Sequence, residues 1–253
     1  MELRPRCWLG SSGESDLGGR CIVTGERVTG VLPPSLRTWL GLVAALAALV
    51  VVVLGVAYAG AGEPGTVDAW IQPTVEGVRS PWRDVALATD FLGEPVGAAM
   101  LVVVTVSGCL LLRRPRAAVL VVAGVATAVG ATTLLKPVVG RTIHGDGNLS
   151  YPSGHTAFLT ALALVVALLT TGRPGLGRTV GMSLVLAAAL VAGCAMGWAQ
   201  VALGAHYPTD VLGGWCTALA VVPATAWLVD RTADRLADRL ADRTADAPRR
   251  ERR

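Results

Sequence analysis

The sequence predicts an all-α integral membrane protein with six transmembrane helices. Of its 253 residues, 53% are hydrophobic and 16% are charged, and the mean hydropathy is +0.56. The apolar residues gather in blocks about 20 residues long, which is enough for a helix to cross a hydrocarbon core of roughly 30 Å. Lipid offers the backbone no hydrogen-bond partners, so these blocks are expected to be helices. The net charge of +4 then gives no reason to expect a nucleic-acid partner, and the expected partner is the lipid bilayer.

The six expected spans follow one another with short loops. The second span ends at Leu112, and its start is unclear because Asp90, Glu94 and Pro95 interrupt the apolar pattern. Before it, residues 61–85 mix charged residues with Trp70 and Trp82, which is typical of a loop or an amphipathic segment at the membrane interface. The other five spans are expected at residues 38–60, 117–135, 154–171, 179–198 and 211–229.

Three regions are expected along the chain: a flexible basic leader (1–37), a six-helix membrane domain (38–229) and a charged helical tail (230–253). Ala57-Tyr58-Ala59 could be read as a signal-peptidase site, but the polar leader is too long for an ordinary signal peptide, which favours a signal anchor. The tail repeats Arg and Asp every four residues, as a solvated helix would. A coiled coil or partner helix is the alternative for this tail.

Arginine-rich loops indicate the orientation. Two expected loops are rich in arginine, and they lie on the same side of the membrane as the two termini. The positive-inside rule places that side in the cytoplasm. The loops 136–153 and 199–210 then face the outside together, as in a bacterial plasma membrane. Five cysteines show neither metal-ligand spacing nor a disulfide pattern. The arginines of the two expected cytoplasmic loops are Arg113, Arg114 and Arg116 in the first loop and Arg173 and Arg178 in the second.

Titratable nitrogen concentrates in the outer loops. The only lysine, Lys136, and all three histidines, His144, His155 and His206, lie between residues 136 and 210. Within Pro-Ser-Gly-His, Ser153 can cap the fourth helix and Gly154 leaves its amide open, so free N–H groups would form an anion site. An ordinary serine-capped helix is the alternative.

The pair His206 and Asp210 can lie on one helical face, because four residues separate them. The carboxylate would take one ring N–H and leave the other nitrogen free to act as a nucleophile or base. The alternatives are that Asp210 only caps its helix and that Lys136 is a snorkelling anchor. Together these residues suit phosphoryl transfer. A metal site built from the histidines and Asp210 lacks a short ligand spacing, so no metal is predicted.

These motifs resemble the type-2 phosphatidic acid phosphatase superfamily, the lipid phosphate phosphatases related to vanadium haloperoxidases. The resemblance extends over all six spans. It implies that His206 is the nucleophile and forms a phosphohistidine, that Asp210 orients it and that His155 is the general acid, with no cofactor. It also implies that Lys136, Ser153 and Gly154 hold the phosphoryl oxygens, so that the active site lies at the extracytoplasmic ends of helices 3, 4 and 6.

Two departures from the family pattern concern phosphate binding. The motif Lys-x6-Arg-Pro would place arginine where this sequence has Ile143, and Ser-Arg-x5-His-x3-Asp would place arginine at Gln200. Charge-assisted hydrogen bonds are worth roughly 1.5 to 3 kcal/mol each, so losing two weakens phosphate binding unless they are replaced. Arg141 and His144 are the available substitutes, and Gln200 can still donate a hydrogen bond. We expect Arg141 to turn into the phosphate site.

The expected function is metal-independent hydrolysis of a membrane lipid phosphate or diphosphate. Isoprenyl diphosphates such as undecaprenyl diphosphate, phosphatidic acid and phosphatidylglycerol phosphate all fit, and the sequence does not choose among them. A phosphotransferase using the same histidine is one alternative. A degenerate member that binds lipid head groups with little catalysis is another, motivated by Ile143 and Gln200. The oligomeric state is left open.

Overall fold

The computed structural model describes residues 30–145, 147–171 and 177–250, and this part of the chain is helical with irregular connections. The prediction of an all-α fold is confirmed for these residues. The predicted leader up to residue 29 and the loop residue Arg173 lie outside the described part. The helices are a short 3₁₀ turn at Pro34–Leu36, α1 (Arg37–Ala57), α2 (Thr66–Val75), α3 (Trp82–Phe91), α4 (Pro95–Leu111), α5 (Pro115–Val139), α6 (Gly154–Thr171), α7 (Arg178–Ala202) and α8 (Pro208–Arg250).

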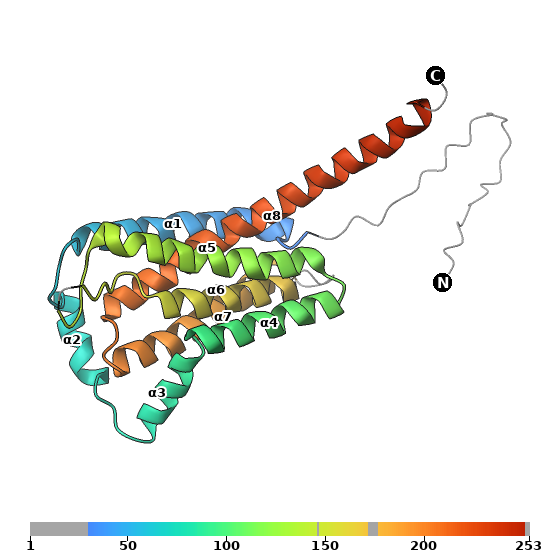
Figure 1. Ribbon diagram of the computed structural model, residues 1–253. Coiled ribbons are helices and arrows are strands. Elements are labelled where there is room, and N and C mark those ends of the chain that lie inside the picture. Colours follow the sequence, from blue (N-terminus) through green and yellow to red (C-terminus); the bar gives the residue numbers. More distant parts are fainter. Residues whose placement is uncertain (1–29, 146, 172–176, 251–253) are drawn as a thin grey trace.

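The membrane spans agree with the prediction in number. Within the described residues, five helices are long and apolar enough to cross a membrane, and α3 with α4 makes a sixth if this bent pair is one span. In Figure 1, α1, α4, α5, α6, α7 and the first part of α8 run alongside one another as a bundle. Exposed leucine and valine side chains cover much of these helices. Such a surface is stable against lipid, so the protein is an integral membrane protein.

The unclear start of the second span becomes a bend in the structure. The axes of α3 and α4 differ by 62°, and α4 begins with Pro95 at its first position after Glu94. Proline has no N–H to donate into a preceding turn and disfavours helix in the residue before it, so the chain turns there. As a result α3 lies across one end of the bundle (Figure 1).

Two spans are longer than predicted. The third was expected to end at Leu135, but α5 continues to Val139 and includes Lys136. The fifth was expected to end at Trp198, but α7 continues to Ala202, so Gln200 lies on a helix rather than in a loop. Both extensions consist mostly of apolar residues next to other helices. Tertiary packing there decides where the helix ends more than the local sequence pattern does.

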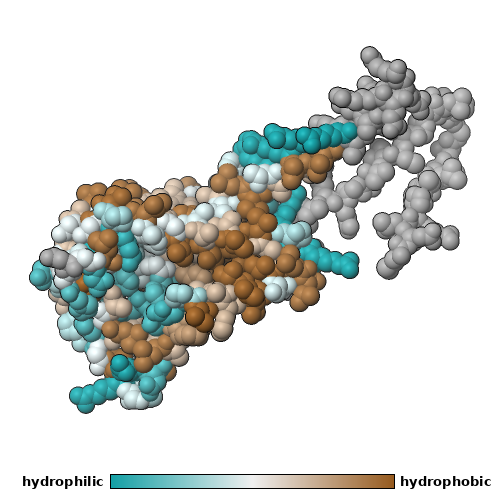
Figure 2. Space-filling view, viewed as in Figure 1, coloured by the Kyte–Doolittle hydropathy of each residue, from teal (hydrophilic) through white to brown (hydrophobic). Residues whose placement is uncertain are grey.

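The two ends of the bundle differ. The helix α8 projects beyond the bundle at one end, where Asp230 accepts hydrogen bonds from the backbone N–H groups of Val31 and Leu32 at 2.8 and 2.9 Å. The helices α2 and α3 lie at the opposite end (Figure 1). Polar residues gather at that opposite end and on the projecting helix, with apolar side chains over the face between them (Figure 2). The predicted charged tail forms the last part of α8, which is helical as far as Arg250.

Glycines on α8 allow the loop before α6 to approach it closely. A Cβ at Gly213 would clash with the ring of Tyr151, and a Cβ at Gly214 would clash with the carbonyl oxygen of Ser153. Only a residue without a side chain fits where two backbones come this close. This contact brings the N-termini of α6 and α8 together at the polar end of the bundle.

Candidate active site

The site is built first on the N-terminus of α8. Asp210 lies in the first turn, and its Oδ2 accepts a hydrogen bond from the backbone N–H of Tyr207 at 3.1 Å. The backbone N–H of Thr209 donates to Oδ1 of Asp68, which belongs to α2, at 2.9 Å. Two N–H groups that an α-helix leaves without internal partners are satisfied in this way. Carboxylates are also favoured there by the helix dipole.

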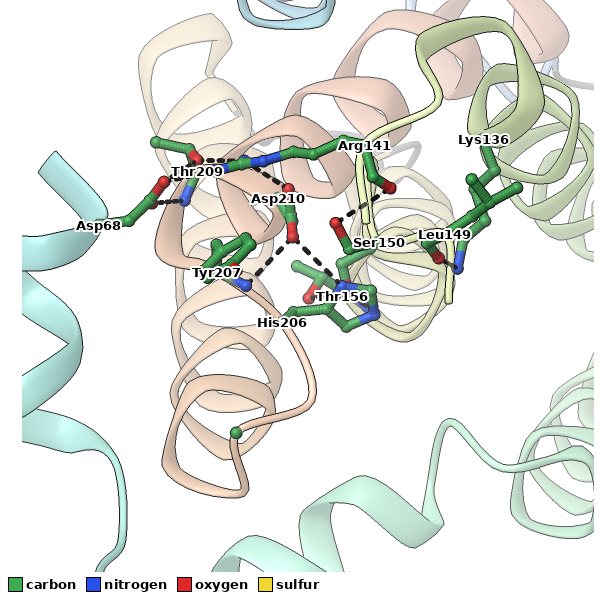
Figure 3. A network of polar contacts seen from close by, with 12 residues as sticks. Asp68, Lys136, Arg141, Leu149, Ser150, Thr156, His206, Tyr207, Thr209 and Asp210 are labelled. Carbon is green, nitrogen blue, oxygen red and sulfur yellow. Dashed lines mark hydrogen bonds and ion pairs between the residues drawn. The ribbon is translucent and has the colours of Figure 1, made fainter. Parts of the chain in front are cut away.

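A buried arginine connects these two carboxylates. One terminal nitrogen of Arg141 donates to Asp210 and to the Thr209 hydroxyl, and the other donates to Asp68, all at 2.6 Å. Arg141, Asp68 and Asp210 are fully buried. The guanidinium also lies over the rings of Tyr58 and Tyr207, 4.1 and 4.5 Å from their centroids. Figure 3 shows Arg141 reaching across the start of α8 between Asp68 and Asp210.

This placement differs from the expectation that Arg141 turns into the phosphate site. Its terminal nitrogens already bind carboxylates, and leaving them would break two buried ion pairs. Separating one such pair costs about 3 to 5 kcal/mol, more than a hydrogen bond to phosphate returns. The structure therefore favours Arg141 as a residue that positions Asp210.

His206 precedes α8 and faces Asp210. Its Nδ1 lies 3.7 Å from Oδ2 of Asp210, which is longer than a hydrogen bond, and Nδ1 is buried without a hydrogen-bond partner among the described residues. Catalytic hydrogen bonds are often this long in a protein without substrate. Burial lowers the pKa of His206 below its ordinary value of 6.5, although Asp210 opposes this shift. The imidazole is therefore neutral near pH 7 and has a lone pair available for attack.

The N-terminus of α6 is held against this pair. The backbone N–H of Ser153 donates to the carbonyl oxygen of Asp210 at 3.0 Å. The Ser153 hydroxyl accepts from the N–H of Thr156 at 3.5 Å, as a capping serine does. At Gly154 a Cβ would meet the Thr132 hydroxyl at an ordinary 3.6 Å, so the protein itself does not require glycine there. The first turn of α6 therefore lies next to Asp210, and the anion site at its N–H groups stays a prediction.

The remaining predicted site residues have different surroundings. Lys136, at the end of α5, donates to the carbonyl oxygen of Leu149 at 2.8 Å (Figure 3), and its charge acts on His206. Nε2 of His144 lies 2.7 Å from the carbonyl oxygen of Gly204, so this exposed ring joins the loop after α5 to the loop before α8. Gln200 is buried on α7 and donates to a carboxylate oxygen of Asp90.

His155 lies in the first turn of α6, beside the bend between α3 and α4. Its Nε2 is 3.7 Å from one oxygen of Asp90 and 3.7 Å from one oxygen of Glu94. A Cβ at Gly93 would clash with the His155 ring, which shows how closely the bend packs against it. The predicted acid therefore has two carboxylates next to it that the sequence reasoning did not assign to the site.

Four site residues were missed from the sequence: Asp68, Asp90, Glu94 and Thr209. Asp90 and Glu94 did give a signal, because acidic residues interrupted an apolar span. Acidic groups inside a membrane span are costly and mark functional positions. Asp68 gave none, since its segment contains other acidic residues and its contact with Thr209 joins residues 141 positions apart.

Comparison with known proteins supports the resemblance drawn from the motifs. The model of the PAP2 superfamily matches residues 117–234, a little under half of the chain. No curated protein matches. Among solved structures, the fold is similar to a transmembrane PAP2-type phosphatidylglycerolphosphate phosphatase from Bacillus subtilis, with a TM-score of 0.58 and 22% sequence identity, over 76% of this chain and 96% of that chain. At this identity the likeness shows a shared fold. The family match over residues 117–234 and the shared fold agree with the motifs that resemble the PAP2 superfamily.

Proposed function

We propose that this protein is a membrane phosphatase that hydrolyses a lipid phosphate or diphosphate. The observation that carries the proposal is that the N-terminus of α6 is bonded to Asp210 through Ser153, and that the same Asp210 lies beside His206. A nucleophile beside an anion-binding helix N-terminus suits phosphoryl transfer. The match of residues 117–234 to the PAP2 superfamily model supports the same activity.

The proposed reaction has two steps. The free ring nitrogen of His206 attacks phosphorus, a P–N bond forms, and the bond to the lipid oxygen breaks. His155 gives its proton to the leaving oxygen. Water then attacks the phosphohistidine and gives a proton to His155, the P–N bond breaks, and inorganic phosphate leaves with both histidines restored. Lys136, Ser153 and Gly154 hold the phosphoryl oxygens, while Arg141 and Asp68 keep Asp210 in place behind the nucleophile.

The substrate is proposed to be an amphiphile whose head group reaches the site from the bilayer. The site is built at the N-termini of α6 and α8, at the end of the bundle where polar residues gather beyond the apolar face (Figure 2). The arginines Arg113, Arg114, Arg116 and Arg178 lie next to the other ends of α4, α5 and α7. By the positive-inside rule those ends are cytoplasmic, which puts the termini in the cytoplasm and the site outside. Phosphatidic acid and isoprenyl diphosphates are the classes to test.

Phosphate release from purified protein in micelles tests the proposal, with His206→Ala as the blank. We expect release well above the blank for at least one lipid phosphate. Brief reaction with a ³²P-labelled substrate should also label wild-type protein with a phosphate that survives alkali and is lost in acid, as a phosphohistidine does. Release no greater than the blank across both classes would instead support the head-group-binding alternative that Ile143 and Gln200 suggest. Formation of a phosphorylated product with an added alcohol would identify a transferase.

A further inference from the structure

An apolar groove runs along the bundle from the bend between α3 and α4. Its volume is about 490 Å³, and its walls come from α4, α6 and α7, with Leu92 of the bend at one end. Apart from Thr105 and Thr170, the lining residues are leucine, valine and alanine. Both threonine hydroxyls donate to carbonyl oxygens of their own helices at 2.7 Å. These walls therefore offer a ligand hydrocarbon contacts rather than hydrogen bonds.

One end of the groove meets the candidate active site at His155. Leu92 lines the groove, and a Cβ on the next residue, Gly93, would clash with the His155 ring. On α6, the groove residues Leu159 and Leu162 follow His155 by four and seven positions, which puts all three on one helical face. A phosphate group held beside His155 would thus have its lipid chain at the entrance of the groove.

The depth of the groove matches one leaflet of a bilayer. Leu159 and Thr170 mark its ends on α6, and this part of the helix, at about 1.5 Å per residue, is roughly 16 Å long. Half of a hydrocarbon core of roughly 30 Å is about 15 Å. The groove residues Val166 and Leu184 are 42% and 41% exposed, so the groove is open along its side. A chain from the leaflet next to the site can therefore enter it laterally.

A second apolar groove opens on another part of the bundle. It has a volume of about 350 Å³, lies between α2, α7 and α8, and includes Pro208 and Leu212 of α8. On the same helix, Asp210 and Gly214 face the N-terminus of α6 through contacts with Ser153. With about 3.6 residues per turn, the first pair lies on the opposite side of α8 from the second. The groove that begins at His155 is therefore the better placed for a substrate held at the site.

We propose that the groove between α4, α6 and α7 holds one apolar chain of the lipid substrate while its phosphate group lies between His155 and His206. This rests on the proposed phosphatase function. Because the surrounding lipid is as apolar as the groove, the chain gains little hydrophobic free energy by entering. Its gain is positional, since a chain held by packing fixes the phosphate group beside the nucleophile. The enzyme therefore selects long-chain phosphates over short-chain ones.

Photolabelling tests the groove independently of turnover. Full-length protein in micelles is irradiated with hexadecyl phosphate that carries a diazirine at the end of its chain, and mass spectrometry of the digest locates the adducts. We expect adducts around Thr170 on α6 and Leu184 on α7, in wild type and in His206→Ala alike. Ala188→Trp fills the groove and should reduce these adducts at least about tenfold. Ala187→Trp, at the exposed neighbouring position outside the groove, is the matched control and should be labelled as wild type is.

A second blocking variant guards against a local effect of Ala188→Trp. Ala163→Trp fills the same groove from α6 and should reduce the adducts equally, with a thermal midpoint close to that of wild type. Adducts that neither substitution reduces would overturn the proposal. Adducts concentrated around Cys194, which lines the second groove, would overturn it as well.

Activity supplies the second arm. The ratio of kcat/KM for hexadecyl phosphate to kcat/KM for butyl phosphate measures the selection for chain length. This ratio should fall at least about tenfold in Ala188→Trp and keep its wild-type value in Ala187→Trp. An unchanged ratio in Ala188→Trp would contradict the groove while leaving the phosphatase function intact. If wild type and His206→Ala are labelled alike in the groove but neither releases phosphate, the groove stands as a lipid-binding site and the proposed phosphatase function fails.

Discussion

Replacing Arg141 with alanine removes the cation that two buried carboxylates share. Arg141 makes ion pairs with Asp68 and Asp210 at 2.6 Å, with all three side chains fully buried. Breaking one buried pair costs about 3 to 5 kcal/mol, a large part of the 5 to 15 kcal/mol by which proteins are typically stable. We therefore expect Arg141→Ala to lower the thermal midpoint in micelles by about 10 °C or more.

The same substitution should affect turnover more than substrate binding. Without Arg141, Asp210 is free to leave its place behind His206, and a misplacement of about 1 Å can reduce turnover by about 100-fold. Phosphate release measured against lipid concentration separates kcat from KM. A variant with an unchanged thermal midpoint and kcat but a raised KM would refute the positioning role, and would show that Arg141 contacts phosphate as the sequence first suggested.

A double substitution provides the control for this prediction. Arg141→Ala with Asp68→Asn removes one of the charges left unpaired, so its loss of stability should be smaller than the sum of the two single losses. Additive losses would show that the guanidinium and Asp68 do not depend on each other. Asp84 is an exposed carboxylate that accepts a hydrogen bond from the Ser80 hydroxyl, so Asp84→Asn should leave the thermal midpoint unchanged.

Three further outcomes follow from the site. Burial lowers the pKa of His206, so kcat/KM should rise with pH as this proton is lost, with the midpoint of the acid limb below pH 6.5; a midpoint above 6.5 would contradict a buried neutral nucleophile. Asp210→Asn removes a charge that raises this pKa, so it should move the same midpoint to still lower pH while kcat falls by a factor on the order of 10² to 10⁴. Gly93→Ala places a Cβ against the His155 ring and should reduce kcat at least about tenfold, whereas Gly41→Ala, where the space is open, should retain full activity.

The spans and the proximity of His206 to Asp210 could be predicted because their signals are local. A block of apolar residues long enough to cross lipid is helical whatever its neighbours are, and the bounds of α1 and α6 agree closely with the expected 38–60 and 154–171. His206 and Asp210 are four residues apart, so helical geometry alone placed them on one side. The order of charges along the chain also predicted that the loops 136–153 and 199–210 lie on the same side of the membrane.

The partners of Arg141 and His155 could not be predicted in this way. Arg141 can form ion pairs, hydrogen bonds and contacts with aromatic rings, and its position in the sequence suggested that it binds phosphate. Its actual partner Asp68 comes from α2, 73 positions away, and only the packing of α2 on α8 decides that contact. In the same way, the bend at Pro95 was visible as an interruption, but its direction toward His155 was not.

The sequence by itself determined that this is an all-α membrane protein, with five or six spans among the described residues, and that His206 and Asp210 lie together at one end. Helical period and bilayer thickness act over short stretches of chain, so these features need no tertiary information. Only the tertiary structure decided that Arg141 lies behind Asp210 (Figure 3) and that Asp90 and Glu94 lie around His155. The physical reason is that a buried charge takes the partner that three-dimensional packing brings to it. Sequence distance does not limit that choice.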